Sequence, residues 1–156
     1  MEEVTVIDVK PQLVLGARTT GPYREIATLI GKVCRFAVES GAMIVGPPMF
    51  VCHEESAEAS HEADRQGNAD IEVVVPVSAA VQGSDEVRCY ELPGGRMAKT
   101  VHKGPYDQCG PAYERLFAWI AASGKNPVGP TRELYLNDPN ELPPSEILTE
   151  IHAPIG

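Results

Sequence analysis

Two stretches of the chain place apolar residues at the three- and four-residue spacing of an amphipathic helix. In residues 23–40 the apolar face is formed by Ile26, Ile30, Val33 and Ala37. In residues 107–123 it is formed by Tyr113, Leu116, Phe117 and Ile120. Gly41 follows the first stretch and Gly124 the second, as is common where a helix ends. The sequence therefore predicts two helices.

Shorter apolar or alternating runs on both sides of these helices predict β-strands. The predicted strands are residues 4–9, 13–19, 49–52, 71–77, 87–92, 97–102, 132–136 and 147–155. Lys10-Pro11-Gln12 separates the first two strands, and Pro93-Gly94-Gly95 separates the fifth from the sixth. Both breaks carry turn-forming residues and predict hairpins. Each half of the chain is thus expected to fold as β-β-α-β-β.

The two halves repeat each other at an offset of 83 residues, except that the connection before the last strand is five residues shorter in the second half. Gly21-Pro22-Tyr23 recurs as Gly104-Pro105-Tyr106, in each case just before a predicted helix. Gly46-Pro47 recurs as Gly129-Pro130, in each case just before a predicted strand. Several turn signals at one offset are typical of an internally duplicated unit.

The duplication leads to a prediction for the fold as a whole. We expect a single α+β domain, residues 1–156, made of two tandem repeats at about 4–77 and 87–155. Its eight strands would form an antiparallel sheet arrangement with two helices, around a pseudo-twofold cleft. A cleft on such an axis is a natural place for a ligand.

The charge of the chain argues against nucleic acid partners, and its hydropathy argues against a membrane-spanning segment. A formal net charge of −9, without a cluster of Lys and Arg, does not suit contacts to phosphates. No run of 18 or more apolar residues is present, so no membrane-spanning segment is predicted. The first residues lack the basic and apolar regions of a signal peptide, which leads us to expect a cytoplasmic protein.

An acidic segment connects the third and fourth predicted strands. From His53 to Glu72 seven carboxylates accompany the single Arg65, a composition typical of a solvated loop. His53 and His61 lie there without the spacing of zinc ligands, and the four cysteines form no CxxC motif. We therefore expect reduced thiols, no metal and no cofactor.

Glu133 is the most unusual polar residue of the predicted strands. The repeat offset aligns it with Phe50, and strand alternation places it on the same face as Tyr135. At this position the sister strand holds an aromatic ring, so the carboxylate is expected to be buried. Burying a carboxylate costs free energy, so its presence there requires an explanation. One reason is an anionic anchor inside an aromatic cleft. The alternative is an edge-facing residue that pairs with Arg132 or Lys99.

Aromatic residues accompany this acid. Tyr106, Tyr113, Phe117 and Trp119 lie on or just before the second predicted helix, close in the expected fold to strand 132–136. Tyrosines around one acid suit the binding of flat organic molecules. The alternative is that these aromatic residues form part of the core and carry a few polar groups. We expect Phe117 to belong to the core. The candidate ligand-binding residues are Glu133, Tyr135, Tyr106, Tyr113, Trp119 and Phe50.

The order of these motifs resembles a known family. The segment Arg132-Glu133-Leu134-Tyr135-Leu136-Asn137-Asp138-Pro139, with Gly104-Pro105-Tyr106 before it, is similar to the GyrI-like small-molecule-binding family. That family includes the effector-binding domains of AraC-type and MerR-type multidrug regulators and stand-alone gyrase-inhibitory proteins. The resemblance covers about Val4 to Ile155 and implies two β-α-β-β-type modules around a cleft, with Glu133 as the buried acidic anchor. The chain departs from those regulators because it shows no DNA-binding segment, so we do not expect direct transcription control.

Three functions follow from these observations. The first is a stand-alone domain that binds hydrophobic, often cationic, small molecules by sequestration or sensing. The second is a hydrolase of strained cyclopropane-type toxins, as the resemblance implies for some members, with Glu133 as general base and Tyr135 or Tyr113 in the aromatic role. The third is an inhibitory module acting on DNA gyrase, with the acidic 53–72 segment imitating nucleic-acid charge. The sequence leaves the ligand, the oligomeric state and any protein partner open.

Overall fold

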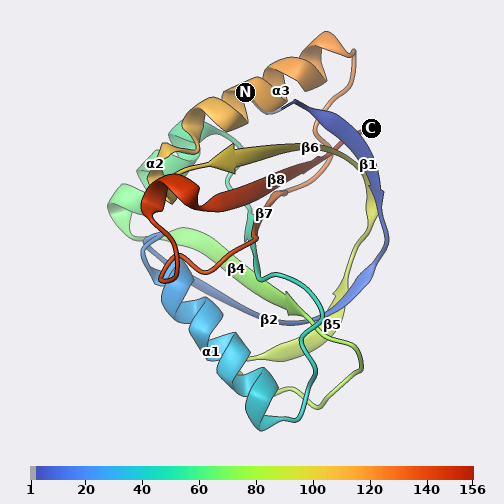
Figure 1. The fold of residues 1–156 in the computed structure, drawn as a ribbon, viewed down its shortest axis with the longest axis vertical. Helices are drawn as coiled ribbons and strands as arrows, with labels where there is room; N and C mark the ends of the chain where they lie inside the picture. Colours follow the sequence, from blue (N-terminus) through green and yellow to red (C-terminus); the bar gives the residue numbers. More distant parts are fainter. Residues whose placement is uncertain (1–2) are drawn as a thin grey trace. The chain divides into compact units, whose positions relative to one another are not determined.

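A computed structural model describes residues 3–156 of the chain. These residues form eight strands and three α-helices (Figure 1). All pairs of neighbouring strands given by the register are antiparallel. The chain divides into two compact units. One unit is the continuous segment Pro11–Pro93, and the other combines the residues up to Lys10 with Gly94–Gly156.

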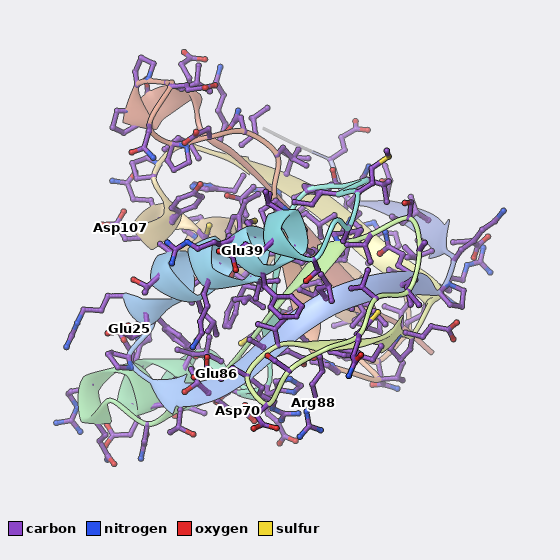
Figure 2. All side chains as sticks on the ribbon, turned by 90° about the horizontal axis from the view of Figure 1, so that it is seen from below. Glu25, Glu39, Asp70, Glu86, Arg88 and Asp107 are labelled. Atoms are coloured by element: carbon purple, nitrogen blue, oxygen red, sulfur yellow. The ribbon has the colours of Figure 1, made fainter. Side chains whose placement is uncertain are left out.

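The unit Pro11–Pro93 is a four-stranded sheet covered by a helix. Its elements are β2 (Gln12–Gly21), α1 (Glu25–Glu39), β3 (Met49–Cys52), α2 (Ala57–Gln66), β4 (Ala69–Pro76) and β5 (Arg88–Leu92). The strand order is β3-β4-β2-β5. Helix α1, whose two ends are labelled in Figure 2, packs against β4 and β2 and buries Val33 and Ala37. The apolar stripe of the sequence is thus the face that meets the sheet.

The second unit has the same plan. Its elements are β1 (Thr5–Val9), β6 (Gly95–Lys103), α3 (Gly110–Ala122), β7 (Thr131–Tyr135) and β8 (Leu148–Pro154), with short 3-10 turns at Tyr106–Gln108 and Pro144–Glu146. The strand order is β1-β6-β8-β7. Leu116 and Ile120 of α3 form a buried cluster with Ala98, Ile151 and Ala153 of the sheet. The α+β class with antiparallel strands is therefore confirmed, whereas the repeat boundaries and the pseudo-twofold cleft stay predictions.

Equivalent details recur at equivalent positions in the two units. The glycine after each helix adopts a left-handed conformation, with φ of 76° at Gly41 and 72° at Gly124, so both helices end in the same way. An isolated bridge follows each of them, Ile44 with Val77 and Pro127 with Ile155. The first members of these two bridges differ by the offset seen in the sequence, which ties the sequence repeat to a structural one.

Both predicted hairpins are wrong. Strand β1 pairs with β6, so that Val9 lies opposite Gly95, and β5 pairs with β2, so that Leu92 lies opposite Gln12. Proline fixes φ near −65°, and two-residue hairpin turns need positive φ at their first central position. Pro93 would occupy that position at one break. At the other break Lys10 would occupy it, and Pro11 restricts this preceding residue to extended backbone. The first strand of each repeat crosses to the sheet of the other repeat.

The acidic segment contains a helix that the sequence pattern did not indicate. Helix α2 begins after Ser56, whose hydroxyl accepts a hydrogen bond from Ala59 N at 3.0 Å, and ends at Gly67 with φ of 71°. None of its residues is buried, so it has no apolar stripe. Helix α2 is solvent-exposed as expected for this segment, but Glu54 and Glu72 are partly buried and accept hydrogen bonds from Tyr23 and Tyr90. The predictions of a solvated loop and of two helices are therefore wrong at this point. Among the described residues no helix has the length and apolar character needed to cross a membrane.

Candidate functional site

Two tyrosine hydroxyls hold the carboxylate of Glu133 in the unit that contains α3. Tyr135, two residues further along β7 and on the same face, donates to Oε1 at 3.0 Å. Tyr113, on the first half of α3, donates to Oε2. Each carboxylate oxygen therefore accepts one tyrosine hydroxyl, one from the strand and one from the helix above it. The sequence predicted this grouping of Glu133, Tyr113 and Tyr135, and the structure brings the three together.

The basic residues near Glu133 in the sequence have other positions. Lys99 pairs with Glu150 at 3.7 Å. Arg132 is buried, and strand alternation directs it to the sheet face opposite that of Glu133. The carboxylate of Glu133 thus meets tyrosine hydroxyls instead of the cations that an edge-facing position would offer.

The surroundings of Glu133 shift the pKa values of the site. Burial raises the pKa of the Glu133 carboxyl above its usual value, and the hydrogen bonds from Tyr113 and Tyr135, with His102 nearby, act in the opposite direction. Burial and the charge of Glu133 raise the pKa of Tyr135 well above its usual value. The tyrosine therefore stays a hydrogen-bond donor at neutral pH, and the acid titrates closer to neutrality than an exposed glutamate does.

Further aromatic rings extend the site outward. The rings of Tyr106 and Tyr135 meet edge to face, with centroids 5.1 Å apart, and those of Tyr113 and Phe117 stack at 6.4 Å. Tyr106 is 38% exposed and Phe117 is 37% exposed, so each pair has an outer ring open to solvent. The expectation that Phe117 belongs to the core is therefore wrong. A flat molecule would find ring faces here beside the acid.

Polar residues that the sequence analysis did not select line the same side of the sheet. His102 on β6 lies opposite Thr149 on β8, and Thr149 lies opposite Tyr135 on β7. His102 Nε2 donates to the carbonyl oxygen of Pro105 at 2.9 Å. Burial and the nearby Glu133 raise the pKa of the Cys109 thiol to about 12, so this cysteine stays protonated. Strand register, which the sequence does not give, is what places these side chains together.

Two predicted site residues have contacts of another kind. Trp119 is partly buried and packs against the apolar cluster around Leu116 and Ile120. It lies six residues after Tyr113 and hence on a different side of the helix. Phe50 is buried in the other compact unit, where its ring meets that of Tyr23 edge to face at 5.6 Å.

The side chains at the site suit an organic ligand better than a metal. Among residues 3–156 no group of three or more His, Cys, Asp and Glu side chains is arranged to hold a metal ion. What the arrangement offers is one carboxylate, neutral hydroxyl donors and ring faces. These groups attract a positively charged or polarisable molecule, with cation–π contacts worth about 0.5–2 kcal/mol each.

Comparison with known proteins places the chain in a family. A model of the GyrI-like small molecule binding domain matches residues 2–155. The C-terminal domain of EcmrR has a TM-score of 0.88 to this chain at 19% identity, covering 100% of this chain and 98% of that one. SAV2435 bound to tetraphenylphosphonium scores 0.61 at 14% identity, with 99% and 94% covered. A hydrolase from Listeria innocua scores 0.67 at 13% identity, with 99% and 92% covered.

At such low identities the similarity to the solved structures shows the fold, whereas the family match extends over nearly the whole sequence. The chain belongs to the GyrI-like small-molecule-binding family.

Proposed function

We propose that the protein binds hydrophobic organic cations at Glu133, with Tyr106, Tyr113 and Tyr135 as the aromatic contacts. The observation that carries the proposal is the carboxylate held by two tyrosine hydroxyls and flanked by the exposed ring of Tyr106. An incoming cation compensates the charge that burial disfavours, so binding and ionisation of Glu133 support each other. The tetraphenylphosphonium bound to SAV2435, which shares the fold, supports this ligand class.

The roles of the tyrosines follow from their positions. The hydroxyls of Tyr113 and Tyr135 keep the carboxylate oriented without supplying a positive charge, so the anion remains available to a ligand. The ring of Tyr106 lies further out and can cover a bound molecule. With a net charge of −9 the protein as a whole also attracts cations and repels duplex DNA, so we propose no nucleic acid partner. A cytoplasmic location remains part of this proposal.

Replacing the acid by its amide tests the proposal directly. Glu133→Gln keeps the size of the side chain but removes its charge, and we expect tetraphenylphosphonium to bind about 10–100-fold more weakly. Glu146→Gln is the matched control, because Glu146 is an exposed carboxylate of the same unit that pairs with Lys103 at 3.2 Å. Titration calorimetry of the two folded variants measures both effects. Equal affinity of Glu133→Gln and the wild type would contradict a role of Glu133 in binding.

Hydrolysis of a strained electrophile is a second candidate, favoured by the raised pKa of Glu133 beside tyrosine hydroxyls. In this reaction the Glu133 carboxylate takes a proton from water while the water oxygen bonds to a cyclopropane carbon. The ring C–C bond breaks, and a tyrosine hydroxyl protonates the leaving carbon or the oxygen conjugated with it. The similarity to the Listeria innocua hydrolase concerns the fold and is consistent with this candidate.

Mass spectrometry of a cyclopropane-bearing alkylator incubated with the protein tests the second candidate. A water adduct is expected to form with the wild type and to form about 10²–10⁴-fold more slowly with Glu133→Gln, which lacks the base. Tyr135→Phe is expected to slow the reaction with less effect on binding. No adduct across a chemically varied panel of alkylators would leave binding alone as the function.

A further inference from the structure

One buried hydroxyl beside the site has no partner. The side chain of Thr149 on β8 has no solvent-exposed surface, and its Oγ1 makes no hydrogen bond within residues 3–156. Buried hydroxyls in folded proteins nearly always have a partner, because an unpaired one loses its bonds to water without replacement. Thr149 therefore needs an explanation that its own fold does not supply.

Strand register places this hydroxyl at the candidate site. Thr149 lies directly opposite Tyr135 on one side and opposite His102 on the other. Residues paired across strands point to the same sheet face, with Cβ atoms about 5 Å apart. The face is therefore the one that carries Glu133. The hydroxyl of Tyr135 donates to Glu133, and Nε2 of His102 donates to the carbonyl oxygen of Pro105. Neither of these hydrogen bonds is made to Thr149.

The other repeat shows what the fold alone requires at this position. After the five-residue contraction before the last strand of the second repeat, Thr149 corresponds to Ile71, which is fully buried in the core of its unit. A branched apolar side chain therefore satisfies the packing. Thr100, on the same face as Thr149, differs from it because its Oγ1 accepts a hydrogen bond from Arg115 at 3.0 Å. The packing of β8 therefore does not require the hydroxyl of Thr149.

We propose that Thr149 is a specificity-determining residue of the Glu133 site, whose hydroxyl bonds a polar substituent of the ligand. This inference rests on the proposed cation-binding function and refines it. The ligand class is an aromatic cation that carries a hydroxyl, amine or carbonyl group about one ring away from its charge. Because Thr149 has no exposed surface, binding of this ligand requires a rearrangement of side chains that opens a path to the hydroxyl.

Two phosphonium ions that differ by one oxygen atom test the proposal. The probes are triphenylphosphonium ions that carry either a para-tolyl or a para-hydroxymethylphenyl group. The wild type is expected to prefer the hydroxymethyl ion by about three- to tenfold, the contribution of one net hydrogen bond. Thr149→Val is expected to bind both ions equally, and Thr149→Ser to keep the preference. Glu133→Gln is expected to weaken both ions by a similar factor.

The ligand-free variants provide an independent measurement. Thr149→Val is expected to melt at the same temperature as the wild type or higher, because it removes an unpaired hydroxyl. Thr100→Val is the matched control and is expected to melt lower, because it removes the acceptor of Arg115. A lower melting temperature for Thr149→Val would show a structural partner for the hydroxyl and overturn the proposal.

The binding data separate the two proposals. Equal affinity of the wild type for both ions, or a preference that survives in Thr149→Val, would overturn the role of Thr149 and leave that of Glu133 intact. A preference that is lost in Thr149→Val while Glu133→Gln binds normally would support Thr149 and contradict the anchor role of Glu133. Failure of the wild type to bind either ion would overturn both.

Discussion

The two repeats solve the same packing problem with different side chains. On the helix-facing side of the sheet, Glu133 and Tyr135 of β7 correspond to Phe50 and Cys52 of β3. Tyr113 of α3 corresponds to Ile30 of α1. One repeat thus lines this side with an apolar core, and the other lines it with an acid and hydroxyls. Since the fold forms with either lining, packing alone does not require the polar one.

The tyrosines that follow the two Gly-Pro turns differ in the same way. The hydroxyl of Tyr23 donates to Glu54 Oε1 at 2.6 Å, and Glu54 Oε2 accepts from Asp70 N at 3.2 Å. This carboxylate therefore fastens the start of α1 to the start of β4. Tyr106, its counterpart, keeps an exposed ring against Tyr135. The same residue is a clamp in one repeat and a candidate ligand contact in the other.

Exchanging the acid between the repeats is the strongest way to break this comparison. Phe50→Glu would bury a carboxylate in a core without its two tyrosine donors, and we expect a loss of about 3–5 kcal/mol in the free energy of unfolding. The reciprocal Glu133→Phe is expected to cost less, because an aromatic side chain packs at the equivalent position. Urea denaturation of the two variants measures the difference. Similar losses would contradict the distinction between a core and a site.

Removing the two tyrosine hydroxyls sharpens the comparison at the turns. Tyr23→Phe is expected to lower the free energy of unfolding by about 1.5–3 kcal/mol, because it removes a hydrogen bond to a charged, partly buried carboxylate. Tyr106→Phe keeps the ring and is expected to change stability by less than about 0.5 kcal/mol. Thermal denaturation of both variants provides the measurement. A larger loss in Tyr106→Phe than in Tyr23→Phe would reverse the assignment of clamp and contact.

The pH dependence of stability gives the smallest effect. The pKa of Glu133 is raised in the folded protein, so its contribution is fully present below the pKa of an unfolded glutamate and declines as pH rises through the folded pKa. Relative to the wild type, Glu133→Gln is therefore expected to become more stable as the pH rises from 4 to 7 (about the range in which glutamates titrate). Cation affinity of the wild type should rise over the same range. Parallel stability curves for the two proteins would contradict a raised pKa.

Local sequence patterns predicted much of the fold and part of the candidate site. Helical spacing, turn glycines and the constant offset predicted α1, α3 and the strands, and the alignment of Glu133 with Phe50 singled out the acid. The predicted hairpins were wrong because the restriction that Pro11 and Pro93 impose on the backbone was not considered, and because local patterns do not give the partner of each strand. Helix α2 was missed because its signal is a cap at each end, without an apolar stripe.

The rest of the site depends on register between distant strands. Thr149 and His102 become neighbours through the pairing of β6 with β8, which no local pattern encodes. Trp119 was placed at the site because it lies near Tyr113 in the sequence, but helix geometry turns it to the apolar cluster. The sequence therefore could not predict site residues that are brought together by strand pairing. It could predict those, such as Glu133, whose type is unusual at their position.

The crossing of β1 and β5 has a consequence for how such a protein arises. Each first strand completes the sheet that contains the other repeat, so a chain with a single repeat would lack one edge strand. Two copies of that shorter chain could supply the missing strands to each other, as a strand-swapped homodimer. Fusion of the two genes would fix this exchange within one polypeptide and free the copies to diverge. A homodimer of identical repeats would carry an acid at this position twice or not at all, whereas this chain carries it once, at Glu133.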